Sequence, residues 1–368
     1  MKTKMILALL TSFILLGGTA FAFHGGGVAH CDGCHSMHNT SDNARSGSAT
    51  SPDLMKGSDA SSTCLNCHNG VARYHVNSAN GANVNQGGDF FWISDSAVHD
   101  QNVRGNIVTY DPDNKGHNVI ALDFGLTQDA TLTAAPGGVY PANTLGCTSC
   151  HDPHGQVNGG TANGTAAISV SGSYGAADPT DGSIHGNYRL LDDSIAAAPV
   201  ATANSYDGKF VDYGTGMSGW CAGCHLDFDT ATNMHPTNVP VPVSYNKYVA
   251  SGDFTGDVAT AYDALVPFER GIDDGSLLDD QSTAGVSTGN EVVMCLSCHR
   301  AHASAFDNAL RWDNTTEFLD HSAILNEATT TLMADGAIPY YKGGVAVDIA
   351  TEYGPWQRQL CNKCHQQD

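Results

Sequence analysis

Apolar residues are spread unevenly along this chain. Residues 6–16 form one mostly apolar run, and no later run approaches the roughly 20 residues that a membrane-spanning helix needs. Two later segments, residues 257–265 and 319–333, are predicted to be helices, with Asp257 and Asp320 as their start signals. Elsewhere, connections rich in glycine, asparagine and proline predict irregular coil.

The N-terminus has the layout of a secretory signal peptide. Lys2 and Lys4 precede the apolar run, and the tripeptide Ala-Phe-Ala at residues 20–22 fits an A-x-A cleavage site. We therefore expect residues 1–22 to be removed and residues 23–368 to form a single exported domain. An uncleaved membrane helix is the alternative, but the run is short and wrongly flanked for that role.

The composition leaves little material for an ordinary side-chain core. Aliphatic residues are sparse, and charged residues make up only 15% of the chain, against about 25% in an average soluble protein. The 16 lysines and arginines are outnumbered by 38 aspartates and glutamates, so the formal charge is −22. Such an acidic chain lacks the basic footprint that nucleic-acid binding requires.

All twelve cysteines belong to one pattern, C-x-x-C-H, which occurs six times. The copies are Cys31/Cys34/His35, Cys64/Cys67/His68, Cys147/Cys150/His151, Cys221/Cys224/His225, Cys295/Cys298/His299 and Cys361/Cys364/His365. This is the attachment signature of c-type haem. The two thiols add across the haem vinyl groups, and the histidine that follows binds the iron.

Three other uses of paired cysteines fit the pattern less well. Zinc sites use C-x-x-C pairs but do not require a histidine directly after each pair. Disulfides are equally indifferent to that histidine. A thioredoxin-like C-x-x-C is expected once, inside a βαβ pattern that this sequence lacks. The repeats therefore predict six covalently bound haems c, whose porphyrins would supply the missing apolar core.

The remaining histidines can supply the sixth ligand of each iron. They are His24, His30, His38, His75, His99, His117, His154, His185, His235, His302 and His321. Three of them extend the first, third and fifth motifs to C-x-x-C-H-x-x-H, namely His38, His154 and His302. A histidine three residues after a proximal ligand lies on nearly the same helical face, so it cannot reach the far side of its own haem. It can ligate a neighbouring haem, which predicts a continuous stack.

Long stretches outside these motifs carry a resemblance to a known family. They include GGVAHCDGCHSMHN, SSTCLNCH, GGDFFW, KGHNVIALDF, TLTAAPGGVYPANTLGCTSCHDPHG, YGTGMSGWCAGCH, CLSCHRAHASAFD and PWQRQLCNKCHQQD. In these stretches the chain resembles the hexahaem outer-surface c-type cytochromes of metal-reducing bacteria, which polymerise into conductive filaments. The resemblance implies a multihaem cytochrome c fold. In it, coil with short helices and few strands wraps around a continuous chain of six stacked haems.

The resemblance also implies a set of distal ligands. The matching histidines are His24, His38, His75, His117, His154, His235 and His302. That is one more than six irons need, and His24 is taken as the surplus or substitute. In the family, the histidine that matches His38 crosses to the next subunit, where it would complete the iron of the fifth motif. The chain is shorter than the family pattern after the third and fourth motifs, which bears on the filament contacts more than on the haems.

Three functions remain open on this reading. The first is an electron conduit, a secreted head-to-tail homopolymer that passes electrons from partner cytochromes to extracellular acceptors such as metal oxides or partner cells. The second is a monomeric periplasmic or secreted shuttle. The third is a multihaem oxidoreductase, which needs an iron with an open position. The surplus of histidines and the absence of any C-x-x-C-K variant favour electron transfer over catalysis.

Overall fold

The computed structural model describes part of the chain. The described residues are 31–36, 54–71, 75–81, 83, 86–94, 99–103, 106–108, 111–151, 153, 199–202, 211–228, 237–247, 256–314, 324–326, 331–332, 340–342, 345–347 and 360–365. The predicted signal peptide, residues 1–22, lies outside them. So do four of the predicted ligands, which are His24, His38, His154 and His235.

Regular secondary structure is short throughout the described segments, as the coil-rich fold class predicts. The α-helices are α2 (Cys31–Cys34), α3 (Ala60–His68) and α5 (Met217–Cys221). The 3-10 turns are η2 (Phe90–Ile93), η3 (Pro112–Asn114), η4 (Leu122–Phe124), η5 (Ala142–Thr144), η6 (Cys147–Ser149), η7 (Leu226–Phe228), η8 (Val243–Asn246), η9 (Val258–Thr260), η10 (Gly275–Leu277), η11 (Cys295–Ser297), η12 (Asp307–Ala309) and η15 (Leu360–Lys363). In the part of the chain that is described, no helix is long and apolar enough to span a membrane.

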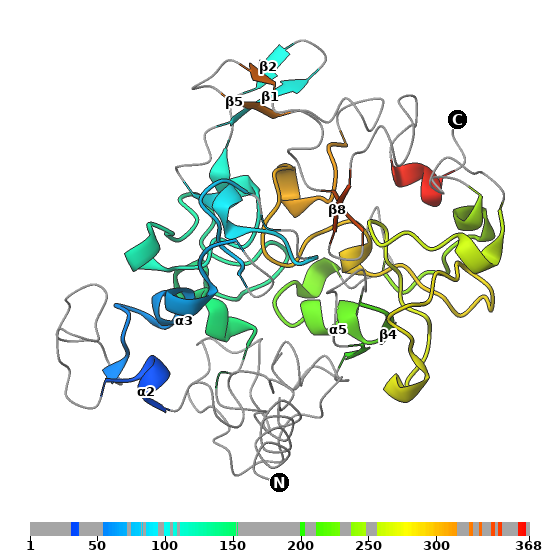
Figure 1. The fold of residues 1–368 in the computed structure, drawn as a ribbon, viewed down its shortest axis with the longest axis horizontal. Helices are drawn as coiled ribbons and strands as arrows, with labels where there is room; N and C mark the ends of the chain where they lie inside the picture. The colour runs from blue at the N-terminus through cyan, green and yellow to red at the C-terminus, as the bar shows by residue number, and fades with distance from the viewer. Residues whose placement is uncertain are drawn as a thin grey trace, which may run out of the picture.

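The strands form small antiparallel sheets. One sheet has the order β2-β1-β5-β6, and two hairpins pair β3 with β4 and β7 with β8. The strands are β1 (His99–Val103), β2 (Asn106–Val108), β3 (Val200–Ala201), β4 (Tyr213–Thr215), β5 (Ile324–Asn326), β6 (Thr331–Leu332), β7 (Tyr340–Lys342) and β8 (Val345–Val347). Figure 1 shows β5 beside β1 and β2, although they lie far apart in the sequence.

The helix predicted for residues 319–333 is wrong where the structure describes that segment. Residues 324–326 and 331–332 are the strands β5 and β6, joined as a hairpin with Leu325 opposite Leu332. β5 also pairs with β1, with Gln101 opposite Ile324. β6 begins at Thr331, and the branched side chain of threonine favours extended backbone.

The helix predicted for residues 257–265 is reduced to the single turn η9. Asp257 does start it, because its carboxylate accepts a hydrogen bond from the Ala259 amide at 3.0 Å. The α-helical bond between Val258 and Tyr262 is not made, because the Val258 carbonyl accepts from Gly285 at 2.7 Å. The Tyr262 amide donates instead to Thr283 at 2.9 Å. Tertiary pairing therefore overrides the local helix signal.

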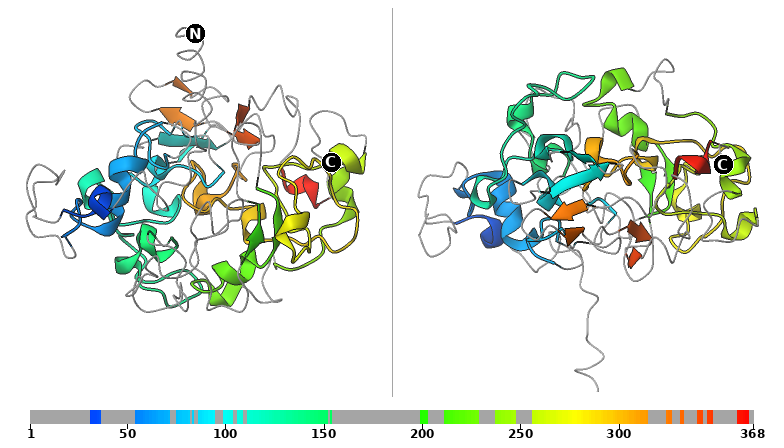
Figure 2. Two further views of the ribbon diagram at one scale, coloured as in Figure 1. Left: turned by 60° about the horizontal axis from the view of Figure 1, so that its bottom comes forward. Right: turned by 90° about the horizontal axis from the view of Figure 1, so that it is seen from above.

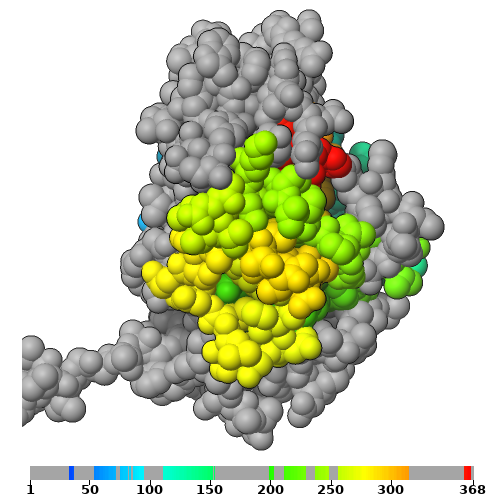
Figure 3. Space-filling view, turned by 90° about the vertical axis from the view of Figure 1, so that its right-hand side faces the viewer, coloured from blue at the N-terminus to red at the C-terminus, as the bar shows by residue number. Residues whose placement is uncertain are grey.

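The chain progresses along the longest axis of the molecule. In Figure 1 the blue helices α2 and α3 lie at one end, the green helix α5 near the middle, and the red C-terminal turn η15 at the other end. The two rotated views in Figure 2 preserve that order. Figure 3 shows the lime and yellow segments, which include residues 237–247 and 256–290, packed together over the C-terminal end.

The protein core is dominated by aromatic and small residues. The main cluster of fully buried apolar side chains includes Leu65, Phe90, Phe91, Trp92, Tyr245, Tyr262, Leu265, Phe268, Phe306, Trp312 and Leu360. Buried carboxylates organise the loops around it. The Asp89 carboxylate accepts hydrogen bonds from the amides of Ser78 and Phe91, at 2.9 and 3.0 Å. Such loops depend on side-chain acceptors because so little of the backbone is paired in helices or sheets.

Glu291 is another loop-organising carboxylate, and it predicts a pH dependence of stability. Its carboxylate accepts from the amides of Ser287, Thr288 and Gly289 at 2.8, 3.0 and 2.8 Å. Desolvation raises the pKa of Glu291, but these hydrogen bonds outweigh it and lower the pKa from 4.5 to about 2. Since the folded pKa is depressed, the stabilisation is complete above about pH 4.5 and is lost as pH falls toward 2.

Glu291→Gln is therefore expected to lower the free energy of unfolding by about 2 kcal/mol at pH 7. The difference from the unmodified protein should shrink steadily between pH 4.5 and 2. Denaturant titrations of the haem-loaded protein across this range would measure it. Asp280→Asn is the matched control, because the Asp280 carboxylate accepts a hydrogen bond from the Gln281 side chain at 3.2 Å. A constant Glu291→Gln difference across the range would contradict the assignment.

Candidate haem sites

The six cysteine motifs form one row in chain order. The thiols of Cys64 and Cys147 lie close enough to affect each other's pKa, which brings the second motif beside the third, and those of Cys221 and Cys295 bring the fourth beside the fifth in the same way. The other neighbours lie within electrostatic range of each other, as Cys34 of Cys64, Cys150 of Cys224, and Cys298 of Cys361. The eleven cysteines whose side chains the structure describes are free of disulfides.

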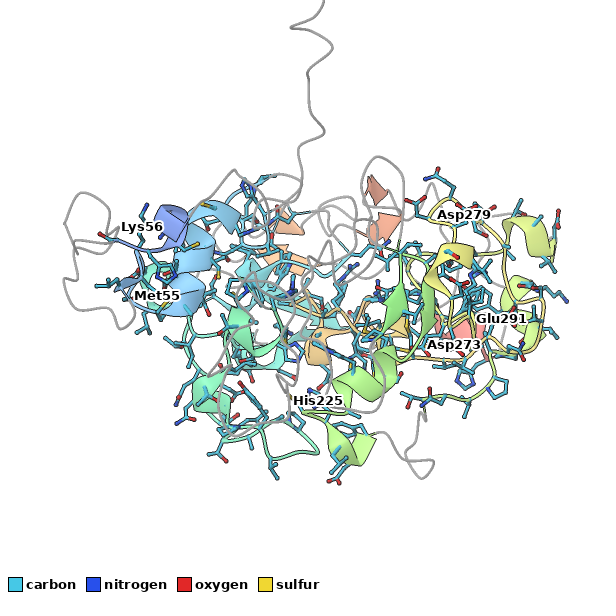
Figure 4. All side chains as sticks on the ribbon, turned by 90° about the horizontal axis from the view of Figure 1, so that it is seen from below. Met55, Lys56, His225, Asp273, Asp279 and Glu291 are labelled. Carbon is cyan, nitrogen blue, oxygen red and sulfur yellow. The ribbon has the colours of Figure 1, made fainter. Side chains whose placement is uncertain are left out.

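Figure 4 makes the direction of this row visible. Met55, whose backbone pairs with His35 of the first motif, lies at one end of the molecule. His225 of the fourth motif lies near the middle, and Glu291, shortly before the fifth motif, lies toward the other end. The motifs therefore run the length of the chain's long axis.

Short hydrogen-bonded turns shape the third to sixth motifs. The amides of His151, His225, His299 and His365 each donate to the carbonyl of the first cysteine of their own motif, at 2.9, 3.1, 3.1 and 2.9 Å. This bond spans four residues, as in one α-helical turn, so the first thiol and the imidazole face the same side. That is the arrangement that two thioether bonds and an iron ligand require of one haem.

Cys67, the second cysteine of the second motif, has an exposed side chain. Among the eleven described cysteine side chains, those of Cys67 and Cys361 are exposed, whereas the other nine are partly buried. Helix geometry explains the exposure of Cys67. It follows the fully buried Leu65 by two residues on α3, about 200° around the helix axis, so it lies on the opposite face. A haem bound through Cys67 would therefore cover the outer face of α3 rather than replace the side chains packed beneath it.

A structural repeat joins pairs of motifs. The Cys147 amide donates to the Ser61 hydroxyl at 3.0 Å, and the Cys295 amide donates to the Ser218 hydroxyl at 3.2 Å. Each serine stands three residues before the first cysteine of the preceding motif. The second and third motifs thus form one unit, and the fourth and fifth form another. These serines were missed from the sequence alone, although their equal offset from the cysteines was a readable signal.

Two pairs of imidazoles face each other. The ring centroids of His117 and His225 are 5.9 Å apart, and those of His151 and His302 are 6.3 Å apart. Two imidazoles bound to opposite faces of one iron hold their centroids about 6 Å apart, because each metal–nitrogen distance is about 2 Å. No set of three or more histidine, cysteine, aspartate or glutamate side chains converges in the described residues as a further metal site.

Backbone carbonyls orient three of the imidazoles. The Nδ1 atoms of His117, His225 and His299 lie 2.7, 2.8 and 2.7 Å from the carbonyl oxygens of Ala301, Pro136 and Asn308. A carbonyl can only accept, so Nδ1 carries the proton and donates it. Nε2 then keeps the lone pair that a metal needs. These carbonyl partners could not be read from the sequence, because a backbone carbonyl carries no side-chain signal and two of the three come from distant loops.

Burial keeps two of these imidazoles, those of His117 and His302, in the neutral form. Desolvation, reinforced by the neighbouring His225, lowers the pKa of His117 from 6.5 to about 4. Desolvation, reinforced by His151 and His117, lowers the pKa of His302 to about 3. A neutral imidazole is the form that binds iron, so both rings are ready to act as ligands at neutral pH.

Backbone hydrogen bonds between three neighbouring segments position His117 and His302. The His117 amide donates to the His302 carbonyl at 2.9 Å, and the His302 amide donates to the Gly87 carbonyl at 2.8 Å. Phe90 stacks on the His302 ring, with centroids 4.8 Å apart. Gly88 has φ +97°, and a Cβ atom there would collide with the Ala303 carbonyl. This glycine therefore lets these segments approach closely enough to present both rings.

His75 is the remaining predicted distal ligand among the described residues. Its ring packs against Gly70, whose backbone lies two residues beyond His68 of the second motif. The neighbouring Val76 amide donates to the His68 carbonyl at 2.9 Å. His75 therefore lies beside the second motif, and its ring is not among the facing pairs described above.

The surroundings of the thiols fit a large apolar group. Beside Cys224 and His225, the apolar side chains of Val139, Leu226 and Phe228 are 82%, 69% and 47% exposed. Gly138 packs so closely on the Cys224 carbonyl that a Cβ atom would collide with it. Exposed apolar side chains gathered beside paired thiols and an oriented imidazole form a surface that a porphyrin would cover.

Comparisons with known proteins agree with this chemistry. No family model matches the chain. The chain is 37% identical to the C-type cytochrome OmcS of Geobacter sulfurreducens, over an alignment of 433 positions that covers 99% of both proteins. The structure is similar to that of the OmcS nanowires from Geobacter sulfurreducens, with TM-score 0.64, 33% identity and coverage of 94% of this chain and 100% of the other.

A second solved structure, the Outer Membrane Cytochrome S Filament from Geobacter sulfurreducens, gives the same TM-score of 0.64, with 35% identity and the same coverage of both chains. The alignment is longer than this chain of 368 residues, so the relative carries insertions where this chain is shorter. Identity of this extent over nearly the whole of both proteins shows the family. The chain belongs to the OmcS family of c-type cytochromes.

Proposed function

We propose that this chain carries electrons along a row of six covalently bound haems c, as a subunit of an extracellular filament. The observation that carries the proposal is the row of motifs in chain order, with imidazoles facing in pairs beside it. The haems supply a one-electron iron couple. The chain holds them in order, supplies their ligands and keeps water away from them.

The two facing pairs suggest a rule for the distal ligands. His302 of the fifth motif faces His151 of the third, so the extra histidine of each odd motif serves the haem two motifs earlier. The same step assigns His154 to the first motif. His38 belongs to the first motif, so its own chain has no motif two places earlier. In a head-to-tail filament of six-motif subunits, the motif two places earlier is the fifth motif of the preceding subunit, and the rule assigns His38 to that haem. This rule supports the cross-subunit bond that the resemblance implied.

The even motifs follow a related rule. His117, which lies between the second and third motifs, faces His225 of the fourth. His117 thus follows an even motif and serves the haem two motifs later. By the same offset His235, which follows the fourth motif, would bind the iron of the sixth motif. His75 and His24 remain as the two candidates for the second. The proposed ligand set thus gives every iron two imidazoles, which suits a low-potential electron carrier rather than an enzyme.

A fully six-coordinate set predicts a simple spectrum. Oxidised, haem-loaded protein should be low-spin at all six irons, as measured by electron paramagnetic resonance and visible absorption. Iron with two strong imidazole ligands is low-spin, whereas an open position gives a high-spin signal. A high-spin signal equal to one iron per assembled chain would instead indicate an oxidoreductase site.

The filament is tested by electron microscopy of purified, haem-loaded mature protein. Thin filaments with a regular axial repeat are expected, with partner cytochromes and extracellular acceptors exchanging electrons along them. Discrete single particles at high protein concentration would overturn the filament and favour a monomeric shuttle. In that case His38 would have to serve a haem of its own chain.

A further inference from the structure

Arg311 is a buried arginine attached to the fifth motif. Only 2% of the residue is exposed. Its amide donates to the Cys298 carbonyl at 2.8 Å, and its side-chain Nε donates to the Leu296 carbonyl at 2.7 Å. Leu296 stands between the two cysteines of the motif. The guanidinium is therefore held against the thiol edge of this motif.

The charge on Arg311 is not neutralised by the described residues. Its Nη1 atom is buried and has no hydrogen-bond partner there, and no carboxylate forms an ion pair with it. The buried Arg270 differs, because its Nε lies 2.7 Å from the Asp212 carboxylate. The Asp263 carboxylate acts on Arg311 electrostatically, but it accepts its hydrogen bond from the Leu265 amide. Arginine stays protonated in proteins, so a positive charge remains at this site.

The repeat makes this charge specific to the fifth motif. The third motif occupies the corresponding place in the preceding unit, where the Cys147 amide contacts Ser61 as the Cys295 amide contacts Ser218. No lysine or arginine occurs between residues 152 and 188, the segment that follows the third motif. An arginine sixteen residues after the first cysteine therefore distinguishes the fifth motif from the third, in addition to the buried Arg300 that directly follows His299 where the third motif has Asp152.

We infer that Arg311 tunes electron transfer, because its buried charge raises the reduction potential of the haem held by Cys295, Cys298 and His299. A ferric haem with two neutral imidazoles carries one positive charge more than the ferrous haem. A fixed cation close to it therefore disfavours the ferric state. When one electron passes from a neighbouring ferrous iron, that neighbour is oxidised and this iron is reduced. The inference rests on the proposed function, because it requires haem at the fifth motif.

The expected size follows from Coulomb's law. At an effective dielectric constant of about 20, one unit charge about 12 Å from the iron changes the ferric-to-ferrous ratio by about tenfold at a fixed potential, and a nearer charge changes it more. For a one-electron couple, a tenfold change corresponds to about 59 mV. The fifth haem would then have a higher reduction potential than the haem on the third motif, and it would act as a local electron acceptor along the row.

The test is a spectroscopic redox titration of haem-loaded protein with Arg311 changed to Gln or to Lys, in assembled filaments or, for single subunits, with imidazole added so that the fifth iron keeps two imidazole ligands. Arg311→Gln removes the charge and is expected to lower the midpoint of one haem in six by about 59 mV, the tenfold change above. Arg311→Lys keeps the charge and is expected to leave all six midpoints in place. Haem content and the low-spin spectrum are recorded first for each variant.

Two results would overturn the inference. One is an Arg311→Gln protein with six low-spin haems and unchanged midpoints. The other is an equal shift in Arg311→Lys, which would indicate a structural role. If Arg311→Gln loses haem, Arg311→Met removes the charge with an apolar chain of similar length, and the same criteria apply. In single subunits added imidazole takes the place of the neighbouring subunit's His38 on the fifth iron, so an absence of filaments would count against the proposed function without deciding the role of Arg311.

Discussion

Replacing His302 with alanine is expected to convert one haem in six from low-spin to high-spin. The His302 ring faces that of His151 at 6.3 Å, and it is neutral and stacked on Phe90. On the proposed ligand set, its loss leaves the iron of the third motif with one protein imidazole. The affected haem should also rise in reduction potential, because the oxidised state loses its second nitrogen donor. Visible absorption and electron paramagnetic resonance on haem-loaded protein would measure the conversion.

Specificity can be judged with a second histidine variant. His185→Ala removes a histidine that the resemblance leaves without a counterpart, and it should leave all six haems low-spin. Added imidazole should restore the low-spin signal of His302→Ala by entering the open position. If His302→Ala with six attached haems stays entirely low-spin, the facing of His302 and His151 is not an iron-bridged pair.

The second large effect is expected from His38→Ala. If His38 ligates the fifth haem of a neighbouring subunit, its removal breaks a metal bond at every subunit junction. Filaments should then fall below detection in electron micrographs, while mass spectrometry still finds six haems per chain. One haem in six should become high-spin at the same time, because the fifth iron loses its partner.

Added imidazole separates ligation from assembly. It should return the His38→Ala protein to a fully low-spin spectrum without restoring filaments, since free imidazole links nothing. His30→Ala is the matched control, a nearby histidine that should leave both spectrum and filaments intact. Filaments that persist in His38→Ala with six-coordinate haems would show that the junction does not depend on this histidine.

Local chemistry was readable from the sequence, whereas long-range pairing was not. The C-x-x-C-H motifs, together with the matching stretches between them, led to the family that the comparisons confirm. The helices predicted at residues 257–265 and 319–333 failed, because their backbone groups pair with partners such as Thr283, Gly285 and β1. A local pattern carries no information about such partners.

The candidate site divides in the same way. The extra histidine in C-x-x-C-H-x-x-H marked His302 as a ligand for a neighbouring haem, but nothing in the sequence said that its ring faces His151. The carbonyls of Ala301, Pro136 and Asn308 carry no side-chain signal at all. In a chain that is mostly coil, such contacts depend on how separate loops pack against each other. Local patterns in a single sequence do not show which loops pack together.

The facing of His151 and His302 also bears on how the protein is made. These imidazoles belong to the third and fifth motifs, so the whole fourth motif lies in the loop between them. Covalent attachment at Cys147 and Cys150 can follow their export at once, but the second imidazole arrives only with the fifth motif. Ligation by His302 then closes a long loop late in folding. This closure stabilises the fold because it lowers the conformational entropy of the unfolded chain. Biogenesis would then proceed in three steps. The unfolded chain is exported, the haems are attached in chain order, and the fold is completed when the later histidines bind the earlier haems.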